Sequence, residues 1–428
     1  MLIFSKTSTS RLQYICKFIF GEQLGIGFSL TIDSEGFAKH EGPKINYSDV
    51  NLAGDDIFVL KNHGLLFEKN IKAQAVDCFE TGGYKAFFRS AGSDFGFDIF
   101  AASFYLMSRY EEYLPHQKDM YGRYAHENAL AFKEDFVNSP VINKWIADFG
   151  NTLKQKFPSL NIKTPAFKFT PTYDIDIAWS YRNKGLLRNV GGFLKSPSLG
   201  RLGVLMGIKK DPYDCYDFLH ELHQQNRLDP IYFFLVATSR GQYDKNISPY
   251  DHSMWQLMKQ HAKQYRIGLH PSWKSNEKHS LLAKEKKILE TAGNIPVTRS
   301  RQHYINLALP ETYERLIEAG ITDDYSMGYG SINGFRASVA SVFSWYNLAT
   351  ESTTALRIHP FCFMDANSFY EQKQNASDSL QELIGYYHQC KNANAELVTI
   401  FHNNFLGTGH LFEGWKEMYS SFIAQLRK

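Results

Sequence analysis

The feature that most constrains the fold is a regular alternation, from Ala166 onward, of short apolar segments with longer segments of helical period. The short segments are rich in β-branched and aromatic residues, as strands are. Alternation of this kind is typical of parallel βα units. Seven strands with intervening helices favour a distorted (β/α)7 barrel over an open sheet. The predicted strands cover residues 166–176, 231–237, 266–272, 297–304, 321–327, 356–364 and 397–404.

The first part of the chain does not alternate in this way. A short strand over 56–60 and a helix over 97–114 predict a smaller α/β or α+β domain there. A chain of 428 residues is long for a single core, and Pro165 ends one element just before the first predicted strand. We therefore expect an N-terminal domain of unknown role over residues 1–160 and the barrel over 166–428.

The charge distribution does not favour a nucleic-acid or membrane partner. The chain has 47 Lys and Arg against 44 Asp and Glu, a net charge of +3, and the two signs are interspersed. Lys17 interrupts the apolar stretch at 12–20, and no stretch approaches the ~18 apolar residues of a membrane span. The five cysteines have neither disulfide nor metal-site spacing. These features predict a cytoplasmic protein with reduced thiols and no membrane span.

Aromatic residues make up 15% of the chain, with 25 Tyr and 33 Phe. Aromatic faces are a common platform for sugar rings, but packing in the core of a large protein explains most of them. The aromatic content alone therefore identifies no ligand.

Six polar residues stand where predicted strands end. Each lies in an apolar or β-rich segment, so its burial costs free energy unless these residues meet one another or a ligand. The strand ends of a βα barrel open onto one face, and we expect the six to converge there. A lone histidine is more often a hydrogen-bonded structural residue, and a lone aspartate can cap a loop, but six together favour a functional site. They are Asp174, Asp176, His270, Arg301, Asp324 and His402.

In this order, the strand-end motifs resemble the polysaccharide deacetylase (NodB, carbohydrate esterase 4) family, most of all the branch whose barrel follows an uncharacterised N-terminal domain. The resemblance covers residues 166–428. TYDID at 172–176 resembles the first motif of the family. The resemblance implies Asp174 as the catalytic base and Asp176 as a metal ligand, or the reverse, because one residue separates the two carboxylates.

IGLHPSWKS at 267–275 resembles the second motif and implies His270 as a metal ligand. Lys274 stands where the family has a second histidine, and a protonated amine cannot ligate a cation. We therefore expect no complete Asp-His-His metal site, with Asp176 and His270 lacking a third partner. The Lys274 amine either points inward and replaces the charge of the cation, or points outward to solvent. We expect the outward geometry, because Pro271 and Trp273 reshape the loop.

The remaining motifs imply the other roles. SRQHY resembles the third motif and implies that Arg301 orients the base. His303 follows Arg301 by two positions, so we expect it on the same face of the strand, in a supporting position. TIFHNN resembles the fifth motif and implies His402 as the general acid, oriented by Asp324 of the fourth motif. GFRA with Arg336 and PFCFMD with Asp365 resemble recurring segments of this branch, without an assigned role.

The activity implied by the resemblance is the removal of N- or O-acetyl groups from a sugar or glycan. A divalent metal, best zinc, would assist the hydrolysis. A second hypothesis, motivated by Lys274, is an inactive barrel that binds a glycan. A third is hydrolysis of another amide or ester without a tightly held metal, with Ser275, His359 or Asp365 recruited as replacement ligands.

Overall fold

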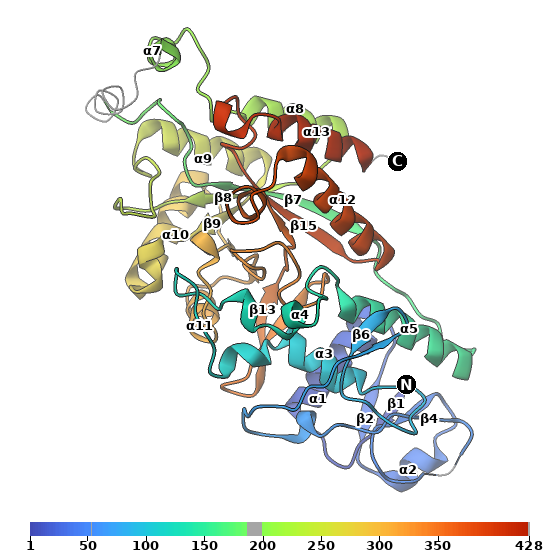
Figure 1. The fold of residues 1–428 in the computed structure, drawn as a ribbon. Helices are drawn as coiled ribbons and strands as arrows, with labels where there is room; N and C mark the ends of the chain where they lie inside the picture. Colours follow the sequence, from blue (N-terminus) through green and yellow to red (C-terminus); the bar gives the residue numbers. More distant parts are fainter. Residues whose placement is uncertain (53, 186–198, 427–428) are drawn as a thin grey trace.

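All seven predicted strands lie in one large sheet of the computed structural model, which describes residues 1–428 except 53, 186–198 and 427–428 (Figure 1). The strand order is β12-β13-β11-β10-β9-β8-β7-β15-β14. Adjacent strands are parallel, except for the antiparallel pair β12–β13. The strands are β7 (Lys168–Ile175), β8 (Ile231–Leu235), β9 (Arg266–His270), β10 (Arg299–Ser300), β11 (Asp323–Asp324), β12 (Phe343–Asn347), β13 (Ser352–Ile358), β14 (Phe363–Met364) and β15 (Glu396–His402).

The predicted strand over 356–364 is divided between β13 and β14. β13 pairs with β11 and β14 pairs with β15, although only residues 359–362 separate the two strands. The backbone N–H of Phe361 donates to the carbonyl oxygen of Met327 at 3.1 Å, and that of Cys362 donates to Val398 at 3.4 Å. The continuous segment of β13 and β14 thus joins β11 and β15, which lie toward opposite ends of the strand order. β12 and its antiparallel pairing were not predicted.

Helices follow β7, β8, β9, β10, β14 and β15, as the alternation predicted, whereas the described residues between β11 and β14 contain no α-helix. In α12 the buried residues Leu383, Tyr386, Tyr387 and Cys390 recur at helical spacing, so one side of the helix faces the core. This helix packs against both α13 and β15 (Figure 1). The helices of this part are α7 (Leu199–Leu205), α8 (Tyr216–Asn226), α9 (His252–Gln264), α10 (His279–Gly293), α11 (Glu311–Glu318), α12 (Ala376–Asn392) and α13 (Trp415–Gln425).

The N-terminal residues form a second, smaller parallel sheet in the order β2-β1-β3-β4, and a hairpin of β5 and β6. The predicted helix over 97–114 ends early, because Arg109 has a left-handed backbone (φ +54°) and a short 3-10 turn, Tyr110–Tyr113, follows. The elements are β1 (Leu2–Phe4), α1 (Ser10–Cys16), β2 (Ser29–Thr31), α2 (Ser34–Lys39), β3 (Lys44–Asn46), β4 (Ile57–Val59), β5 (Phe79–Thr81), β6 (Tyr84–Ala86), α3 (Ile99–Met107), α4 (Leu130–Lys133) and α5 (Val141–Lys156).

The N-terminal region and the large sheet share one hydrophobic core, which extends from Ile3 to Ile423. Charged side chains also cross between them. Glu112 accepts hydrogen bonds from Arg336 at 2.6 and 2.8 Å and from Arg109 at 2.7 Å, and all three side chains are buried. Burial alone would raise the pKa of Glu112, but Arg336 and Arg109 outweigh it and lower the pKa to about 2. The contact is therefore a buried, fully ionised cluster.

None of the helices within the described ranges is long and apolar enough to cross a membrane. The five cysteines are free thiols, and Cys78 is the one that is partly exposed.

Candidate active site

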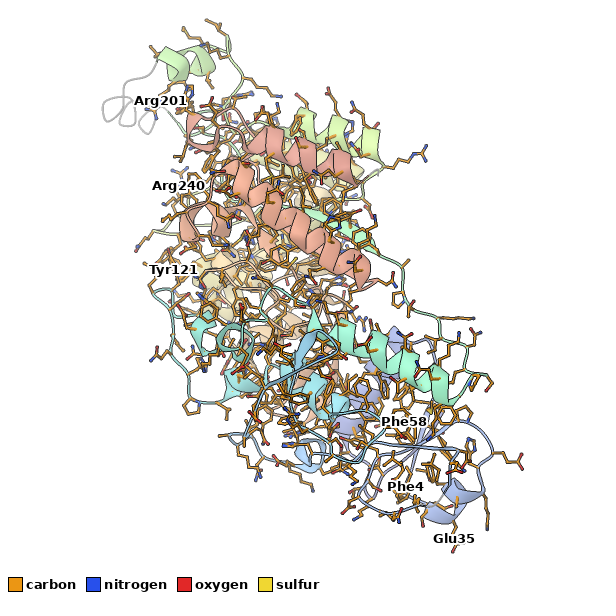
Figure 2. The ribbon with its side chains drawn as sticks, turned by 45° about the vertical axis from the view of Figure 1, so that its right-hand side comes forward. Phe4, Glu35, Phe58, Tyr121, Arg201 and Arg240 are labelled. Carbon is orange, nitrogen blue, oxygen red and sulfur yellow. The ribbon has the colours of Figure 1, made fainter. Side chains whose placement is uncertain are left out.

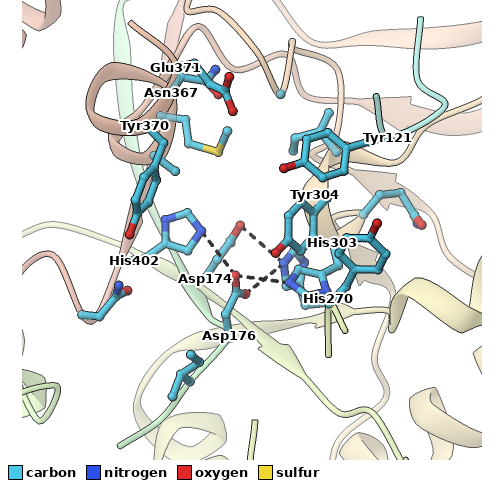
Figure 3. A pocket seen from close by; sticks show the side chains of 18 of the residues that line it. Tyr121, Asp174, Asp176, His270, His303, Tyr304, Asn367, Tyr370, Glu371 and His402 are labelled. Carbon is cyan, nitrogen blue, oxygen red and sulfur yellow. Dashed lines mark ion pairs between the residues drawn. The ribbon is translucent and has the colours of Figure 1, made fainter. Parts of the chain in front are cut away.

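A pocket of 430 Å³ opens where β7, β9 and β15 end (Figure 3). Four of the predicted site residues line it: Asp174, Asp176, His270 and His402. Side chains alternate along a strand, so residues two positions apart, such as Asp174 and Asp176, point to the same side. The register of β7 and β15 places Asp174 directly beside His402.

Arg301 lies behind Asp174 instead of in the pocket wall. Its Nη1 donates to Asp174 Oδ1 at 2.8 Å and to Thr172 Oγ1 at 2.7 Å, and its Nε donates to the carbonyl oxygen of Tyr325 at 3.0 Å. The Arg301 and Asp174 side chains are at most 2% exposed. A buried, charge-assisted hydrogen bond of this kind fixes the orientation of the carboxylate.

Asp176, His270 and His303 form a group whose potential ligand atoms all lie within 4.8 Å of one another. Asp176 Oδ1 is 3.2 Å from His270 Nε2, and Asp176 Oδ2 is 3.4 Å from His303 Nε2 (Figure 3). The Oδ1 atom is buried and makes no hydrogen bond. The three side chains could therefore hold a metal ion.

The hydrogen bonds behind the two imidazoles fit this use. His270 Nδ1 lies 2.6 Å from the carbonyl oxygen of Arg301, which can only accept, so Nδ1 carries the proton and Nε2 is left as a lone pair in the neutral ring. His303 Nδ1 lies 3.1 Å from Asp244 Oδ1 in the same arrangement. Metal-bound histidines are commonly supported in this way, and one carboxylate with two imidazoles is a donor set that suits a divalent ion such as zinc.

His303 supplies the imidazole that the second motif lacks. Lys274 is exposed in a short turn after β9, as expected, and does not reach the pocket. The expectation that Asp176 and His270 lack a third partner is therefore wrong: the partner comes from the segment after β10. Neither Ser275 nor His359 takes its place, because Ser275 Oγ donates to the carbonyl oxygen of Ser272 and His359 pairs with Asp323.

His402 pairs with Asp365, and the expected pairing with Asp324 is not found. His402 Nδ1 lies 2.6 Å from Asp365 Oδ1, and the backbone N–H of His402 donates to Asp365 Oδ2 at 2.6 Å. Asp324 instead accepts hydrogen bonds from Ser300 and Ser326. The reason is strand order, since β14 is the neighbour of β15 and Asp365 directly follows β14, whereas β11 lies between β10 and β13.

The charges of the site stabilise one another. Burial alone would lower the pKa of His402, but Asp365, Asp176 and Asp174 outweigh it and raise the pKa to about 10. Burial would likewise lower the pKa of His303, yet Asp176 and Asp244 raise it to about 9. Burial would raise the pKa of Asp176, but His303 and His270 outweigh it and hold this pKa well below its usual range. Without a metal, the pocket thus holds an ionised carboxylate among cationic imidazoles.

Arg336, which resembles a recurring family segment, belongs to the buried cluster with Glu112 and not to the pocket. The N-terminal region does reach the pocket, through Tyr121 and Arg123. Figure 2 labels Tyr121 far from Phe4 and Phe58 of the first sheet and nearer the large sheet. The sequence carries no local signal for this contact.

Comparison with protein families adds a match in the N-terminal region. Residues 1–158 match a family described as Family of unknown function (DUF7033). No curated protein matches the chain.

Solved structures with similarity to the chain include polysaccharide deacetylases, a CE4 family pseudoenzyme and an allantoinase. A protein assigned as a polysaccharide deacetylase from Mycobacterium smegmatis has a TM-score of 0.41 and 12% identity, covering 61% of this chain and 84% of its own. Another from Pseudomonas aeruginosa PAO1 has a TM-score of 0.37 and 11% identity over 61% and 84%. A CE4 family pseudoenzyme from Bacillus anthracis has a TM-score of 0.32 and 9% identity over 62% and 65%. At these values the similarities assign no activity to this chain.

Proposed function

We propose that this chain is a metal-dependent hydrolase that removes acetyl groups from an amino sugar or acetylated glycan. The observation that carries the proposal is the convergence of Asp176, His270 and His303 in one pocket, beside a buried Arg301–Asp174 pair and a His402–Asp365 pair. A metal group, a fixed carboxylate and a cationic imidazole can together supply the Lewis acid, the base and the acid of a metal-assisted amide hydrolysis.

Asp176, His270 and His303 would hold the cation, and zinc suits these donors best. When bound, the ion would polarise the acetyl carbonyl and lower the pKa of the attacking water. Since Asp176 Oδ1 is buried and makes no hydrogen bond, its lone pairs are available to a cation. The Nε2 atoms of His270 and His303 lie 3.2 and 3.4 Å from the two carboxylate oxygens of Asp176.

Asp174 is the proposed base. Its Oδ1 is held by Arg301, while Oδ2 lies 3.8 Å from His270 Nε2 at the edge of the metal group. As the water oxygen bonds to the acyl carbon, Asp174 would accept the proton that the water loses. The hydrogen bonds of Arg301 hold the carboxylate in one orientation before the reaction.

His402 is the proposed acid. Asp365 raises its pKa, so the imidazole is protonated at neutral pH. As the carbon–nitrogen bond breaks, His402 would donate its Nε2 proton to the leaving nitrogen, giving acetate and a free amine. Asp174 then releases its proton to solvent and His402 is protonated again.

The proposed scaffold is the predicted seven-stranded barrel over 166–428, behind a separate N-terminal unit over 1–160. Support for closure comes from the segment of β13 and β14, which pairs with β11 on one side and β15 on the other. Support for the division comes from the strands of each sheet, since the small sheet uses only residues 2–59 and the large sheet only residues 168–402.

The test is acetate release by the full-length protein from N-acetylated chito-oligosaccharides and from O-acetylated xylan, with and without prior removal of metal. We expect release that stops after chelation and returns with zinc. Asp174→Asn is the matched variant, because it keeps the shape of the side chain and removes the base. Release that is equal in Asp174→Asn and wild type, or unaffected by chelation, would contradict the proposal. The inactive glycan-binding alternative was motivated by Lys274, and His303 removes that motive.

A further inference from the structure

Four aromatic rings from four separate segments meet at the mouth of the pocket. They are Tyr121, Tyr243, Trp273 and Tyr304, and every pair among them lies in ring contact, with centroids between 4.1 and 6.3 Å apart. None of the four is fully buried. Three of them, Tyr121, Tyr243 and Tyr304, line the pocket. Core packing therefore does not explain this cluster.

The cluster begins next to the metal group. Tyr304 directly follows His303, and the two rings have centroids 4.7 Å apart. Figure 3 shows Tyr121 and Tyr304 on the side of His303, with Tyr370 and His402 across the pocket and Asp174 and Asp176 between them. A ligand that places its reacting group at Asp176 thus has an aromatic wall beside it.

Contacts within the N-terminal region hold Tyr121 in place in this aromatic cluster. Asp119 Oδ1 accepts hydrogen bonds from the backbone N–H groups of Tyr121 at 2.9 Å and Arg123 at 3.0 Å. The Arg123 guanidinium, which is 5% exposed, pairs with Asp119 at 2.7 Å and lies 4.7 Å from the centre of the Tyr121 ring.

Arg123 also ties this loop to the neighbouring ring. Its Nη1 donates to the carbonyl oxygen of Tyr304 at 2.5 Å. Tyr304 has a left-handed backbone (φ +58°), a strained conformation that surrounding contacts must hold. Gly330 allows the approach, because a Cβ there would overlap Arg123 Nη1. The wall is thus held by specific contacts between distant parts of the chain.

We infer that Tyr121, Tyr243, Trp273 and Tyr304 form a subsite that stacks a sugar ring next to the reacting one, and that Tyr121 makes the N-terminal region a determinant of specificity. This inference rests on the proposed function. A pyranose ring has an apolar C–H face with hydroxyl groups around its edge, which suits half-exposed aromatic rings. The amide side chains of Gln302 and Asn404 in the same pocket provide partners for hydroxyl groups.

The first test measures the Kd of triacetylchitotriose by calorimetry with the full-length, metal-free protein, so that binding is separated from hydrolysis. We expect Tyr121→Ala to weaken binding by about 3- to 10-fold, the value of one aromatic contact. Tyr121→Phe retains the ring and should stay within about 2-fold of wild type. Tyr250→Ala is the matched control, since Tyr250 is 58% exposed and outside the pocket.

The second test measures the hydrolysis of triacetylchitotriose. Tyr121→Ala should raise its KM by a similar factor, whereas Tyr250→Ala, which lies outside the pocket, should leave KM unchanged. Gly330→Ala keeps every ring but displaces Arg123, and should weaken trisaccharide binding as well. Equal thermal melting of the variants and wild type excludes a folding defect.

The two ideas fail in different ways. Trisaccharide binding that Tyr121→Ala weakens, without acetate release, would support the subsite and contradict the proposed function. Acetate release with Kd and KM unchanged in Tyr121→Ala would contradict the subsite and leave the proposed function standing. No binding of the trisaccharide to the wild type would also overturn the subsite.

Discussion

At the scale of single residues, the candidate metal group contains His303, which the sequence predicts only in a supporting position beside Arg301. His303 was expected to share the side of Arg301 because residues two apart in a strand point the same way. The strand β10 ends at Ser300, however, and the turn His303–Ile305 directs His303 toward Asp176. Asp174, Asp176, His270 and His402 were placed together correctly, because the ends of parallel strands meet. Their catalytic and ligand roles stay predictions.

Removal of His303 should therefore abolish tight metal binding. His303→Ala should weaken zinc binding by at least about 100-fold, because loss of a mere supporting group already costs ~10–100-fold. Lys274→Ala is the matched control and should bind zinc like the wild type, since Lys274 is exposed and outside the pocket. The measurement is calorimetric titration of the chelator-treated protein. A weaker affinity in Lys274→Ala and an unchanged one in His303→Ala would reverse our assignment.

The pairing of Asp365 with His402 should appear in the pH dependence of activity. Among the carboxylates that raise the pKa of His402, Asp365 contributes most, so Asp365→Asn should lower this pKa. A general acid must be protonated, and activity is lost as pH rises through its pKa. The alkaline limb of kcat should therefore move to lower pH in Asp365→Asn, with kcat reduced by about 10²- to 10⁴-fold. Asp324→Asn, which leaves the His402 contacts intact, should keep the wild-type limb; a limb that moves only in Asp324→Asn would contradict this.

At the scale of elements, the sequence predicts which segments form the strands of the large sheet, but it does not predict the order of those strands. Each of the seven predicted segments contains a strand, because apolar β-rich segments between amphipathic helices leave little alternative. The order of strands depends on long-range pairing, which local pattern does not encode. That is why the sequence motifs point to Asp324 as the partner of His402, whereas the structure pairs His402 with Asp365, and why the sequence does not predict β12.

Asp98, the cap of α3, gives a prediction for stability. Its Oδ1 accepts from the backbone N–H groups of Phe100 and Ala101, and its Oδ2 accepts from Tyr47 and His63. Burial is the main cause that raises its pKa from 3.8 to about 6. The folded state then binds the proton more tightly than the unfolded state, so this group lowers stability as pH rises from about 4 to about 6.

Asp98→Asn cannot titrate and should lack this contribution. Chemical denaturation of both proteins at several pH values between 4 and 6 measures it. We expect the free energy of unfolding to fall less steeply with rising pH in Asp98→Asn than in wild type. Parallel pH profiles of the two proteins would show that Asp98 does not titrate in this range.

At the scale of the whole molecule, the N-terminal region is joined to the large sheet by a shared core and by buried charge. The sequence indicated a change of character near Pro165, but not that Glu112 would meet Arg336 or that Tyr121 would reach the pocket. Such contacts join residues about 180 to 220 positions apart, and no local pattern specifies them.

Loss of Glu112 should destabilise the whole molecule. Glu112→Gln leaves Arg109 and Arg336 buried without their counter-charge, which costs on the order of 3–5 kcal/mol. Asp49→Asn is the matched control, because Asp49 and its partner Lys6 are both exposed, and solvent screening leaves such a pair little effect on stability. Denaturant unfolding of both variants gives the comparison. A loss in Glu112→Gln no larger than that in Asp49→Asn would mean that this cluster does not stabilise the contact.

The central claim is that Asp176, His270 and His303 hold a divalent metal together. Anomalous diffraction at the zinc absorption edge, from crystals of the full-length protein with zinc, tests it most directly. We predict one strong peak within coordination distance of Asp176 Oδ1 and of the Nε2 atoms of His270 and His303, at about 2.0–2.2 Å. A peak elsewhere in the molecule, or no peak in the pocket at saturating zinc, would contradict the account.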